Sequence, residues 1–296
     1  MKNNDIQMIQ LYCTVCDIYD SRLAHITQRL SNNFRPKFTD EECITIVIWG
    51  IMQQKFELKT VYNSIKADWS DWFPSLPSYQ AFNKRFCSLA DAFTECASAC
   101  MDHLGLDPAV RSHLIDSMPI QVANGRRSST ARVAPDLCSK GFCGSKDSYY
   151  YGVKLHMLGQ KRHRSIPLPA LISISPAHVS DLSAAKDLLS SCSGLDIFAD
   201  KAYIDSSWWQ ELRDQQDIHV FTPVKLRKGQ QHLDAADHLF SSAVSGARQA
   251  IESFFSWLQS KTHIHAASKV RSSDGLRSFI FARLAAACLS LSLFAV

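Results

Sequence analysis

Residues 197–204 read IFADKAYI, an apolar run that is interrupted by an aspartate and a lysine before it becomes apolar again. A carboxylate at the end of a buried strand is costly unless a cation or hydrogen-bond donors surround it. The sequence therefore raises the question of what Asp200 holds. Asp116 raises the same question, because it lies inside the apolar stretch 112–123, SHLIDSMPIQVA, which is also predicted to be a strand.

Strands and helices alternate in the chain around these two aspartates. Further strands are predicted at 149–158, 166–175, 195–200 and 219–225, and helices at 181–192, 205–216 and 246–261. Residues 124–146 are polar and rich in arginine, with little periodicity. Three strands in succession, followed by strands that alternate with helices, indicate a mixed sheet with helices packed on it. The predicted fold class is α/β.

The chain begins with a region that is predicted to be all helical. Thr39 and Glu42 form a capping box ahead of the apolar run ITIVIWGIM, residues 44–52, which we expect to be central to its domain. An amphipathic helix is predicted before it, with this apolar stripe: Ile9, Tyr12, Cys16, Tyr19, Leu23, Ile26 and Leu30.

Two of the predicted helices have the outline of a helix-turn-helix. A helical stretch at 58–72 is followed by the break FPSLP and by a second helix that begins at Ser78. That second helix would offer Asn83, Lys84 and Arg85 to DNA. Ordinary packing of two helices has the same pattern, and residues 1–110 carry 10 basic against 13 acidic residues, which opposes phosphate binding.

The positive charge of the chain is concentrated in one segment. Residues 111–165 carry 10 basic against 3 acidic side chains, whereas the net charge of the whole chain is only +4. Such a segment suits a polyanion such as nucleic acid, although a solvated loop has the same composition.

Composition also bears on the cellular compartment. Among the ten cysteines, Cys13 and Cys16 form a CxxC, but no second CxxC or nearby HxxxH completes a zinc site. The polar start does not resemble a signal peptide, so reduced thiols and a cytoplasmic protein are expected. The apolar residues 279–296 are interrupted by Arg283 and several serines, which favours a buried helix over a membrane span.

A third carboxylate completes a set. Asp116 and Asp200, brought together at strand ends, would repel each other unless a cation lay between them. Glu252 lies at the border of an apolar helical stripe, with Arg248 four residues before it on the same face. Alone, each acid could be a helix cap or part of an ion pair, but together they predict a site for a hard divalent cation with oxygen ligands.

The motifs that carry these acids are LIDSMPI (114–120), IFADKAY (197–203) and RQAIESFF (248–255), with GVKLH (152–156) between the aspartates. In this order they resemble the DDE transposases of bacterial insertion sequences, and come closest to insertion-sequence group nine-eight-two. The chain departs from the family pattern at a few positions beside the acids: Ala202, Ser245 and Gln259.

The resemblance implies a fold and a catalytic site. The fold would be a ribonuclease H-like mixed sheet flanked by helices in residues 109–296, preceded by an all-helical N-terminal domain in residues 1–108. Asp116, Asp200 and Glu252 would be the catalytic triad and would hold two Mg²⁺ ions, with Mn²⁺ as a substitute.

The resemblance also implies an activity and partners. The protein would cleave double-stranded DNA at the terminal inverted repeats of its element and transfer the strands into target DNA. It would act as a homodimer or larger assembly on DNA, associated with the nucleoid in the bacterial cytoplasm, with no membrane partner. A metal-dependent nuclease that does not join strands, or a catalytically silent regulator of the element that binds DNA, remains an alternative.

A set of basic and polar residues would then contact DNA. In the second domain these are Arg126, Arg127, Arg132, Lys140, Lys146, Lys154, His156, Lys201, Arg248 and Lys261, and in the first domain Asn83, Lys84 and Arg85. Lys161, Arg162 and Arg164 would extend the same basic track, and Tyr149 to Tyr151 would stack on exposed bases.

Overall fold

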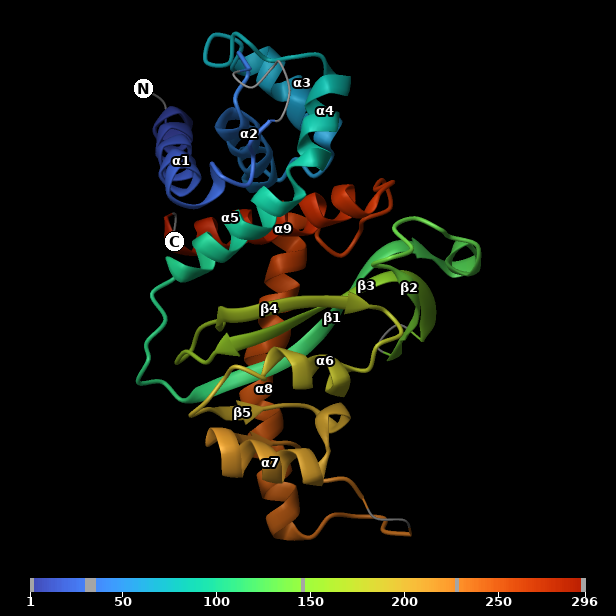
Figure 1. The fold of residues 1–296 in the computed structure, drawn as a ribbon. Coiled ribbons are helices and arrows are strands. Elements are labelled where there is room, and N and C mark those ends of the chain that lie inside the picture. Colours follow the sequence, from blue (N-terminus) through green and yellow to red (C-terminus); the bar gives the residue numbers. More distant parts are fainter. Residues whose placement is uncertain (1–2, 30–35, 145–146, 227–228, 294–296) are drawn as a thin grey trace. The chain divides into compact units, whose positions relative to one another are not determined.

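The computed structural model describes residues 3–29, 36–144, 147–226 and 229–293 (Figure 1). The chain forms two compact units, one of Met1–Leu104 with Leu258–Val296 and one of Gly105–Trp257. We call them the helical unit and the sheet unit. The sequence predicted one division, after residue 108, and did not include the grouping of the last residues with the first helices. As a division into functional domains, that boundary stays a prediction.

The sheet unit contains a mixed sheet. Its strands are β1 (Ser112–Asn124), β2 (Ser139–Cys143), β3 (Ser148–Gln160), β4 (Leu168–Pro176), β5 (Asp196–Phe198) and β6 (His219–Phe221). The order within the described residues is β2-β3-β1-β5-β6, with β4 also paired to β3. Strand β3 is antiparallel to its neighbours, whereas β1, β5 and β6 are parallel. The predicted mixed α/β sheet is therefore confirmed.

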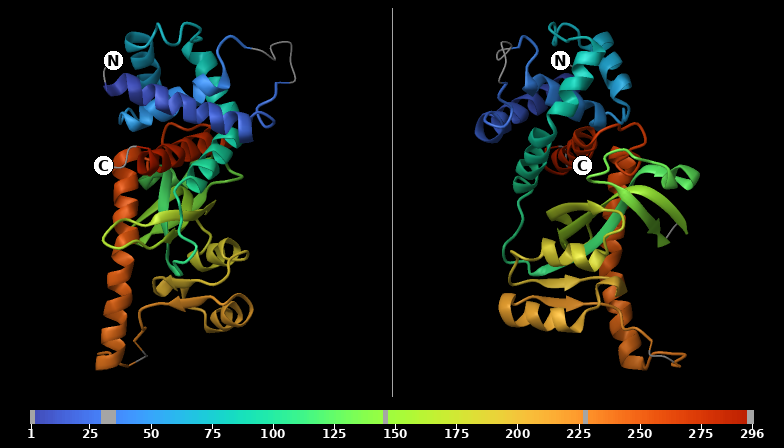
Figure 2. Two further views of the ribbon diagram at one scale, coloured as in Figure 1. Left: turned by 90° about the vertical axis from the view of Figure 1, so that its left-hand side faces the viewer. Right: turned by 45° about the vertical axis from the view of Figure 1, so that its right-hand side comes forward.

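Helices cover both faces of this sheet. They are α6 (Asp181–Leu188), α7 (Ser206–Gln216) and α8 (Ala235–Thr262). Figures 1 and 2 show α8 along one face of the sheet and α6 and α7 on the other. On the α6 and α7 face, Ile115, Leu158 and Ile197 are buried in a core with Trp208 and Leu212. Because side chains alternate along a strand, residues next to Ile115 point toward the α8 face.

Two parts of the sheet unit differ from the predictions. Strand β2 lies within the segment that lacked periodicity, because its five residues, SKGFC, pair with β3 through the backbone and bury few side chains. Helix α8 begins eleven residues before the predicted start at 246. The GVKLH motif is a strand as predicted, and its Gly152 is required by a close strand approach, since a Cβ there would lie 2.1 Å from the carbonyl oxygen of Ile120.

The helical unit is built around two buried helices. It contains α1 (Asn3–Ile18), η1 (Tyr19–Leu23), α2 (Asp40–Met52), α3 (Leu58–Asp68), α4 (Tyr79–Ser88), α5 (Ala90–Asp102) and α9 (Ser273–Ser292). Helix α2 is buried from Cys43 to Ile51, as its apolar sequence predicted. The predicted capping box is confirmed: Thr39 Oγ1 accepts from the Glu42 amide at 3.2 Å, and Glu42 Oε2 accepts from the Thr39 amide at 2.7 Å.

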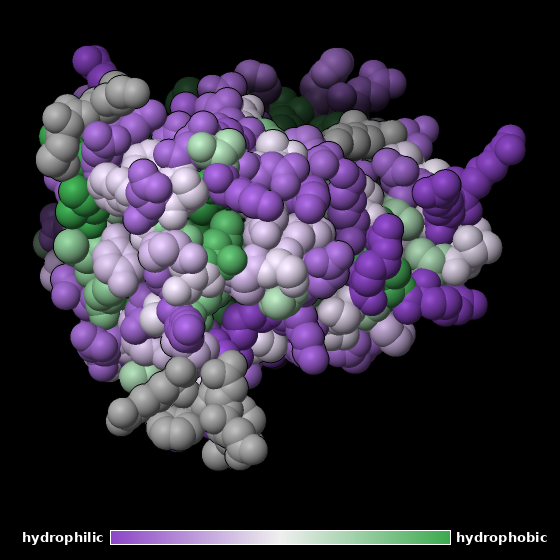
Figure 3. Space-filling model, turned by 90° about the horizontal axis from the view of Figure 1, so that it is seen from above, coloured by the Kyte–Doolittle hydropathy of each residue, from purple (hydrophilic) through white to green (hydrophobic). Residues whose placement is uncertain are grey.

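The predicted stripe of α1 was wrong in register. The buried side chains are Met8, Leu11, Val15 and Ile18, whereas Ile9 and Tyr12 are exposed and Cys16 is half-buried. Other large apolar side chains of the helical unit are also exposed. The face of the molecule drawn in Figure 3 is nevertheless mostly hydrophilic, with small hydrophobic patches. Leu30, the last member of the predicted stripe, lies outside the described residues.

Helix α9 is long and apolar enough to cross a membrane, and no other helix among the described residues meets that test. Most of its side chains are nevertheless buried against α5, α2 and α4. It is therefore a core helix of the helical unit, as the arginine and serines in its sequence predicted.

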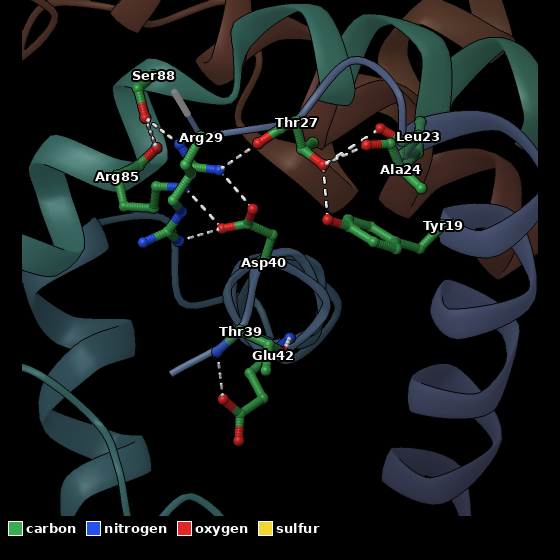
Figure 4. A network of polar contacts seen from close by, with 10 residues as sticks. All are labelled: Tyr19, Leu23, Ala24, Thr27, Arg29, Thr39, Asp40, Glu42, Arg85 and Ser88. Carbon is green, nitrogen blue, oxygen red and sulfur yellow. Dashed lines mark hydrogen bonds and ion pairs between the residues drawn. The ribbon is translucent and has the colours of Figure 1, made fainter. Parts of the chain in front are cut away.

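A buried carboxylate ties α2 to α4. Asp40 is only 5% exposed and accepts from two arginines: Arg29 Nη2 at 2.7 Å, and Arg85 through Nε at 2.6 Å and through Nη2. Figure 4 shows both guanidinium groups directed at this carboxylate. Arg85 also donates to the Thr27 carbonyl at 3.3 Å. The predicted DNA contact of Arg85 therefore competes with a pairing inside the fold, because most of its donors are already used.

We predict that Arg85→Met lowers the unfolding free energy by about 2–4 kcal/mol, because Asp40 would keep only one of its two arginines in a buried site. Urea denaturation measures this decrease. Lys84→Met is the matched control, since Lys84 is its exposed neighbour and should change stability by less than about 0.5 kcal/mol. A fully stable Arg85→Met protein with weakened DNA binding would contradict the structural role.

Candidate active site

The pairing of β5 with β1 brings two aspartates together. The parallel register sets Ser112 opposite Asp196 and Leu114 opposite Phe198. Because parallel strands run in the same direction, moving two residues on from the pair Leu114 and Phe198 reaches Asp116 on one side and Asp200 on the other. The two aspartates therefore lie beside each other. Asp200 in the IFADKAYI stretch therefore follows the short strand β5, whose pairing with β1 places it near Asp116.

Asp116 lies on the α8 face of the sheet, in the middle of β1. Its side chain is 20% exposed; Oδ1 accepts from the Ser117 amide at 2.8 Å and Oδ2 lies 3.4 Å from Arg248 Nη2. The pKa of Asp116 is raised to about 6, first by burial and then by the charges of Asp200 and Asp181, while the Ser117 amide and Arg248 act in the opposite direction. Burial is therefore the main reason that the pKa of Asp116 is raised, and the neighbouring acids add to it.

Asp200 has two functions that the sequence could not separate. One oxygen, Oδ1, accepts from the Ala202 amide at 2.7 Å and caps the short 3₁₀ turn η4 (Lys201–Tyr203). This bond corresponds to the helix-cap alternative that the sequence left open. It occupies one carboxylate oxygen, and the negative charge still acts on Asp116.

Glu252 lies on the helix face that carries Arg248. Arg248 is 14% exposed, and its Nη2 atom is 3.4 Å from Asp116 Oδ2 and 4.0 Å from Glu252 Oε1. Glu252 itself is 61% exposed. The structure thus brings Asp116, Asp200 and Arg248 together, and connects Glu252 to them through the arginine. The Nε atom of Arg248 is buried and has no hydrogen-bond partner within the described parts of the chain.

Asp181 belongs to this site and was not predicted from the sequence. It is the first residue of α6, and its Oδ1 accepts from Ser117 Oγ at 2.9 Å and from Lys154 Nζ at 3.0 Å. Lys154 Nζ also donates to the Val179 carbonyl at 2.9 Å. The available signal was Ser180, a predicted N-cap, but an acid in a first helical turn is usually explained by the helix dipole alone. The network fixes the residue that follows Asp116.

Tyr203 was also missed as a site residue, although it belongs to the IFADKAY motif. It is 2% exposed, and its buried hydroxyl has no hydrogen-bond partner among the residues that the structure describes. Burial raises the pKa of Tyr203 well above its usual value, and the charges of Asp116, Asp181 and Asp200 raise it further. An unsatisfied hydroxyl within the field of three acids indicates a polar site that these side chains alone do not complete.

The donor chemistry of the site fits a divalent cation. Asp116 and Asp200 supply carboxylate oxygens, and a cation would favour the ionised form of Asp116, which burial first and then the charges of Asp200 and Asp181 disfavour. Glu252 does not complete the set in this side-chain arrangement: within the described parts of the chain, no three His, Cys, Asp or Glu side chains lie close enough to hold one ion. The fit therefore rests on the two aspartates, with Glu252 on the adjacent helix face.

The predicted DNA contacts of the sheet unit fall into two groups. Exposed side chains are those of Arg126, Arg127, Arg132, Lys140 and Lys201. By contrast, Lys154 is paired with Asp181, and Arg248 lies between the acids.

His156 is 1% exposed, its Nε2 lies 2.7 Å from Ser175 Oγ, and burial lowers its pKa to about 4. A neutral buried imidazole cannot reach phosphate, so the structure gives His156 a role inside the fold in place of the predicted contact.

The other predicted DNA contacts belong to the helical unit or to residues that the structure does not describe. Lys261, Asn83 and Lys84 are exposed, and Arg85 is paired with Asp40. Lys146 lies outside the described residues.

A curled mixed sheet flanked by helices, with a helical N-terminal region, is consistent with the ribonuclease H-like fold of DDE transposases. The sequence matches the family described as transposase DDE domain over residues 113–289, which is more than half of the chain. The protein belongs to this family of DDE transposases. A search of curated proteins gives no match to the chain.

We predict that Asp116→Asn gains stability over the parent in metal-free buffer as pH rises. Folded Asp116 keeps its proton up to about pH 6 and the unfolded residue only to about 3.8, so the parent loses stability as pH rises through this window. Asparagine does not titrate and keeps the bond from the Ser117 amide. The difference should reach roughly 2–3 kcal/mol above pH 7, at about 1.4 kcal/mol per pKa unit.

Urea denaturation from about pH 3.5 to about pH 8 measures this difference, because that range spans the folded and the unfolded pKa. Asp187→Asn is the control, because Asp187 is exposed on α6 and should show no such window. A pH-independent difference for Asp116→Asn would contradict the electrostatic account of the site.

Proposed function

We propose that this DDE transposase cleaves DNA at the ends of an insertion sequence and joins them to target DNA. Asp116, Asp200 and Glu252 are the catalytic residues of this proposal. It is supported most strongly by the β1–β5 register, which sets Asp116, within β1, beside Asp200, just after β5, in the matched domain. The motifs LIDSMPI, IFADKAY and RQAIESFF favour insertion-sequence group nine-eight-two.

In this proposal, two Mg²⁺ ions, or Mn²⁺ ions in their place, are held by Asp116, Asp200 and Glu252. DDE transposases generally use divalent metal ions. When bound, such ions supply charge stabilisation for the in-line displacement of a phosphodiester oxygen by water or by a DNA 3′ hydroxyl. Asp116 must be ionised to act as a ligand, and Glu252 must turn from solvent toward Asp116.

The neighbouring residues of the chain would prepare this geometry. The Ser117 amide orients one oxygen of Asp116, and Asp181 with Lys154 holds Ser117 in place. Arg248 lies between Asp116 and Glu252 and screens their mutual repulsion before DNA arrives. Its Nε is buried and has no hydrogen-bond partner among the described residues, which leaves Arg248 with one unused donor inside the site.

The partners follow from this chemistry. We propose that the protein binds double-stranded DNA, at its element's terminal inverted repeats and at the target, and that two or more copies assemble on it. The exposed Arg126, Arg127, Arg132 and Lys140 would position the duplex through its phosphates. The setting would be the bacterial cytoplasm and nucleoid.

We expect Asp116→Asn, Asp200→Asn and Glu252→Gln each to abolish cleavage and joining of labelled element ends in Mg²⁺, while DNA binding is retained. Removing a metal ligand by an isosteric amide takes away charge and keeps shape, so activity should fall by more than about a thousandfold. Gel analysis of nicked and joined products gives the readout. Products that are cut but never joined by the parent protein would favour the nuclease alternative.

A matched control for this experiment is Asp187→Asn, which changes the same functional group on the surface of α6. It should cleave and join as the parent does. Full activity of Glu252→Gln would remove Glu252 from the proposed triad and leave the two aspartates.

The basic segment gives a separate prediction. Changing Arg126, Arg127 and Arg132 together to alanine should weaken DNA binding and make the plot of log affinity against log salt shallower, by about 0.9 in slope for each phosphate that is no longer neutralised. Fluorescence anisotropy over a salt series measures the slope. Arg213→Ala serves as control, because Arg213 is exposed on α7, outside this segment. An unchanged slope in the triple variant would return the segment to a solvated loop.

A further inference from the structure

The helical unit contains a pocket of about 360 Å³ that the proposed chemistry does not use. It is bounded by α2, α3, α4, the start of α9 and the residues that precede α9. Its volume falls within the range of about 300–1,000 Å³ that is typical of small-molecule sites. Asn83, a predicted DNA contact on α4, lies in its wall.

The pocket gathers cations in an otherwise acidic region. Five basic side chains line it, against one acid, Glu57: Lys55, Lys59, Lys269, Arg271 and Arg283. Glu57 already pairs with Lys269, with Nζ and Oε1 2.5 Å apart. By comparison, the helical unit carries 15 basic and 13 acidic residues in all, so the rest of it has 10 basic against 12 acidic residues. The local excess of positive charge therefore favours an anionic ligand at this pocket.

Arg283 contributes a buried charge to the wall. Its guanidinium donates to the carbonyls of Thr262, Phe279 and Phe56 at 3.0, 3.1 and 2.8 Å, and no carboxylate among the described residues pairs with it. Burial lowers the pKa of Arg283 to about 9. A guanidinium has five N–H donors, so these three bonds leave two of them available. The residue holds the fold together and still presents positive charge to the pocket.

Aromatic side chains form the rest of the lining. They come from separate elements: Phe56, Tyr79, Phe86 and Phe279. Lys59 Nζ lies over the Tyr79 ring, 4.2 Å from its centre, so a cation and an aromatic ring are in contact in the pocket wall. Aromatic rings stack on nucleobases without much regard to sequence, and cations contact the adjoining phosphates.

We propose that this pocket binds an unpaired nucleotide of DNA, with its base among the aromatic side chains and its phosphates at Lys55, Lys59 and Arg271. A bare phosphate would leave the aromatic wall unused, and an uncharged base would leave the cations unused. A duplex is too wide for a cavity of this volume. An unpaired nucleotide offers a base to the aromatic side chains and a phosphate to the cations, and it is small enough for the pocket.

This proposal rests on the proposed function, because that function identifies the ligand as DNA. It can fail separately, because it concerns binding in the helical unit and not phosphodiester chemistry. The test therefore uses the full-length protein in metal-free buffer with EDTA, where no cleavage occurs.

The probe is a short DNA duplex with one unpaired 2-aminopurine nucleotide at an end, compared with the same duplex made blunt. We expect the parent to bind the overhang duplex about tenfold more tightly than the blunt one, the scale of one base stacked on an aromatic side chain. The fluorescence of 2-aminopurine should fall on binding, because stacking on an aromatic ring quenches it.

Matched substitutions locate the effect. Tyr79→Leu and the double variant Lys55→Gln with Lys59→Gln should lose the preference for the overhang and keep blunt-duplex binding. The controls are Lys66→Gln, an exposed lysine on the same helix as Lys59, and Tyr12→Leu, an exposed tyrosine on α1; neither residue lines the pocket. Circular dichroism establishes that each variant is folded, and the lysine variants alter only side chains at the pocket's rim.

Loss of the preference and of the quenching in the pocket variants, with both retained in the controls, supports the proposal. Equal binding of overhang and blunt duplexes by the parent overturns it and leaves the proposed transposase function intact. Quenching that persists in the pocket variants also overturns it, since the base then stacks elsewhere. A parent that binds neither duplex contradicts both proposals.

Discussion

The parallel pairing of β5 with β1 is the constraint on which the active site depends. Three residue pairs define it, and the two positions that follow place Asp116 beside Asp200. The fold gains hydrogen bonds and the buried Ile197 from this pairing, but it also sets two like charges against each other. A strand so short would be a weak element alone, so its position is maintained by β6 on one side and β1 on the other.

Because side chains alternate along β1, Asp116 and Ser117 make their contacts on opposite faces of the sheet. Asp116 points to the α8 face, where Arg248 meets it, and Ser117 points to the α6 face, where Asp181 accepts from its hydroxyl. Lys154 of the neighbouring strand supplies the counter-charge to Asp181. The orientation of the Asp116 carboxylate is therefore coupled to the position of α6, through one backbone amide and one hydroxyl.

Much of this architecture follows from the sequence, because the strand around Asp116, the capping box at Thr39 and the buried α2 depend on local signals, which are apolar period and cap residues. The partners of charged and polar side chains depend on tertiary contacts, which local signals do not reveal. Arg85 pairs with Asp40, 45 positions away in sequence, and His156 contacts Ser175 of the neighbouring strand β4. In the sequence, Asp181 is an ordinary acid in the first turn of a helix. Its contacts with Lys154 and Ser117 exist only in the folded structure. In α1, apolar residues occupy two overlapping stripes, and only packing against α2 selects the buried one.

The proposed chemistry requires that Asp116, Asp200 and Glu252 together hold divalent metal. Crystals of the protein grown with Mn²⁺ and measured at the manganese absorption edge would show whether they do, because anomalous scattering locates the ions independently of the protein. We expect anomalous peaks in contact with Asp116 and Asp200, with Glu252 turned from solvent to complete the ligands. The absence of a peak at the aspartates, or a bound ion with Glu252 still directed to solvent, would contradict the three-carboxylate site.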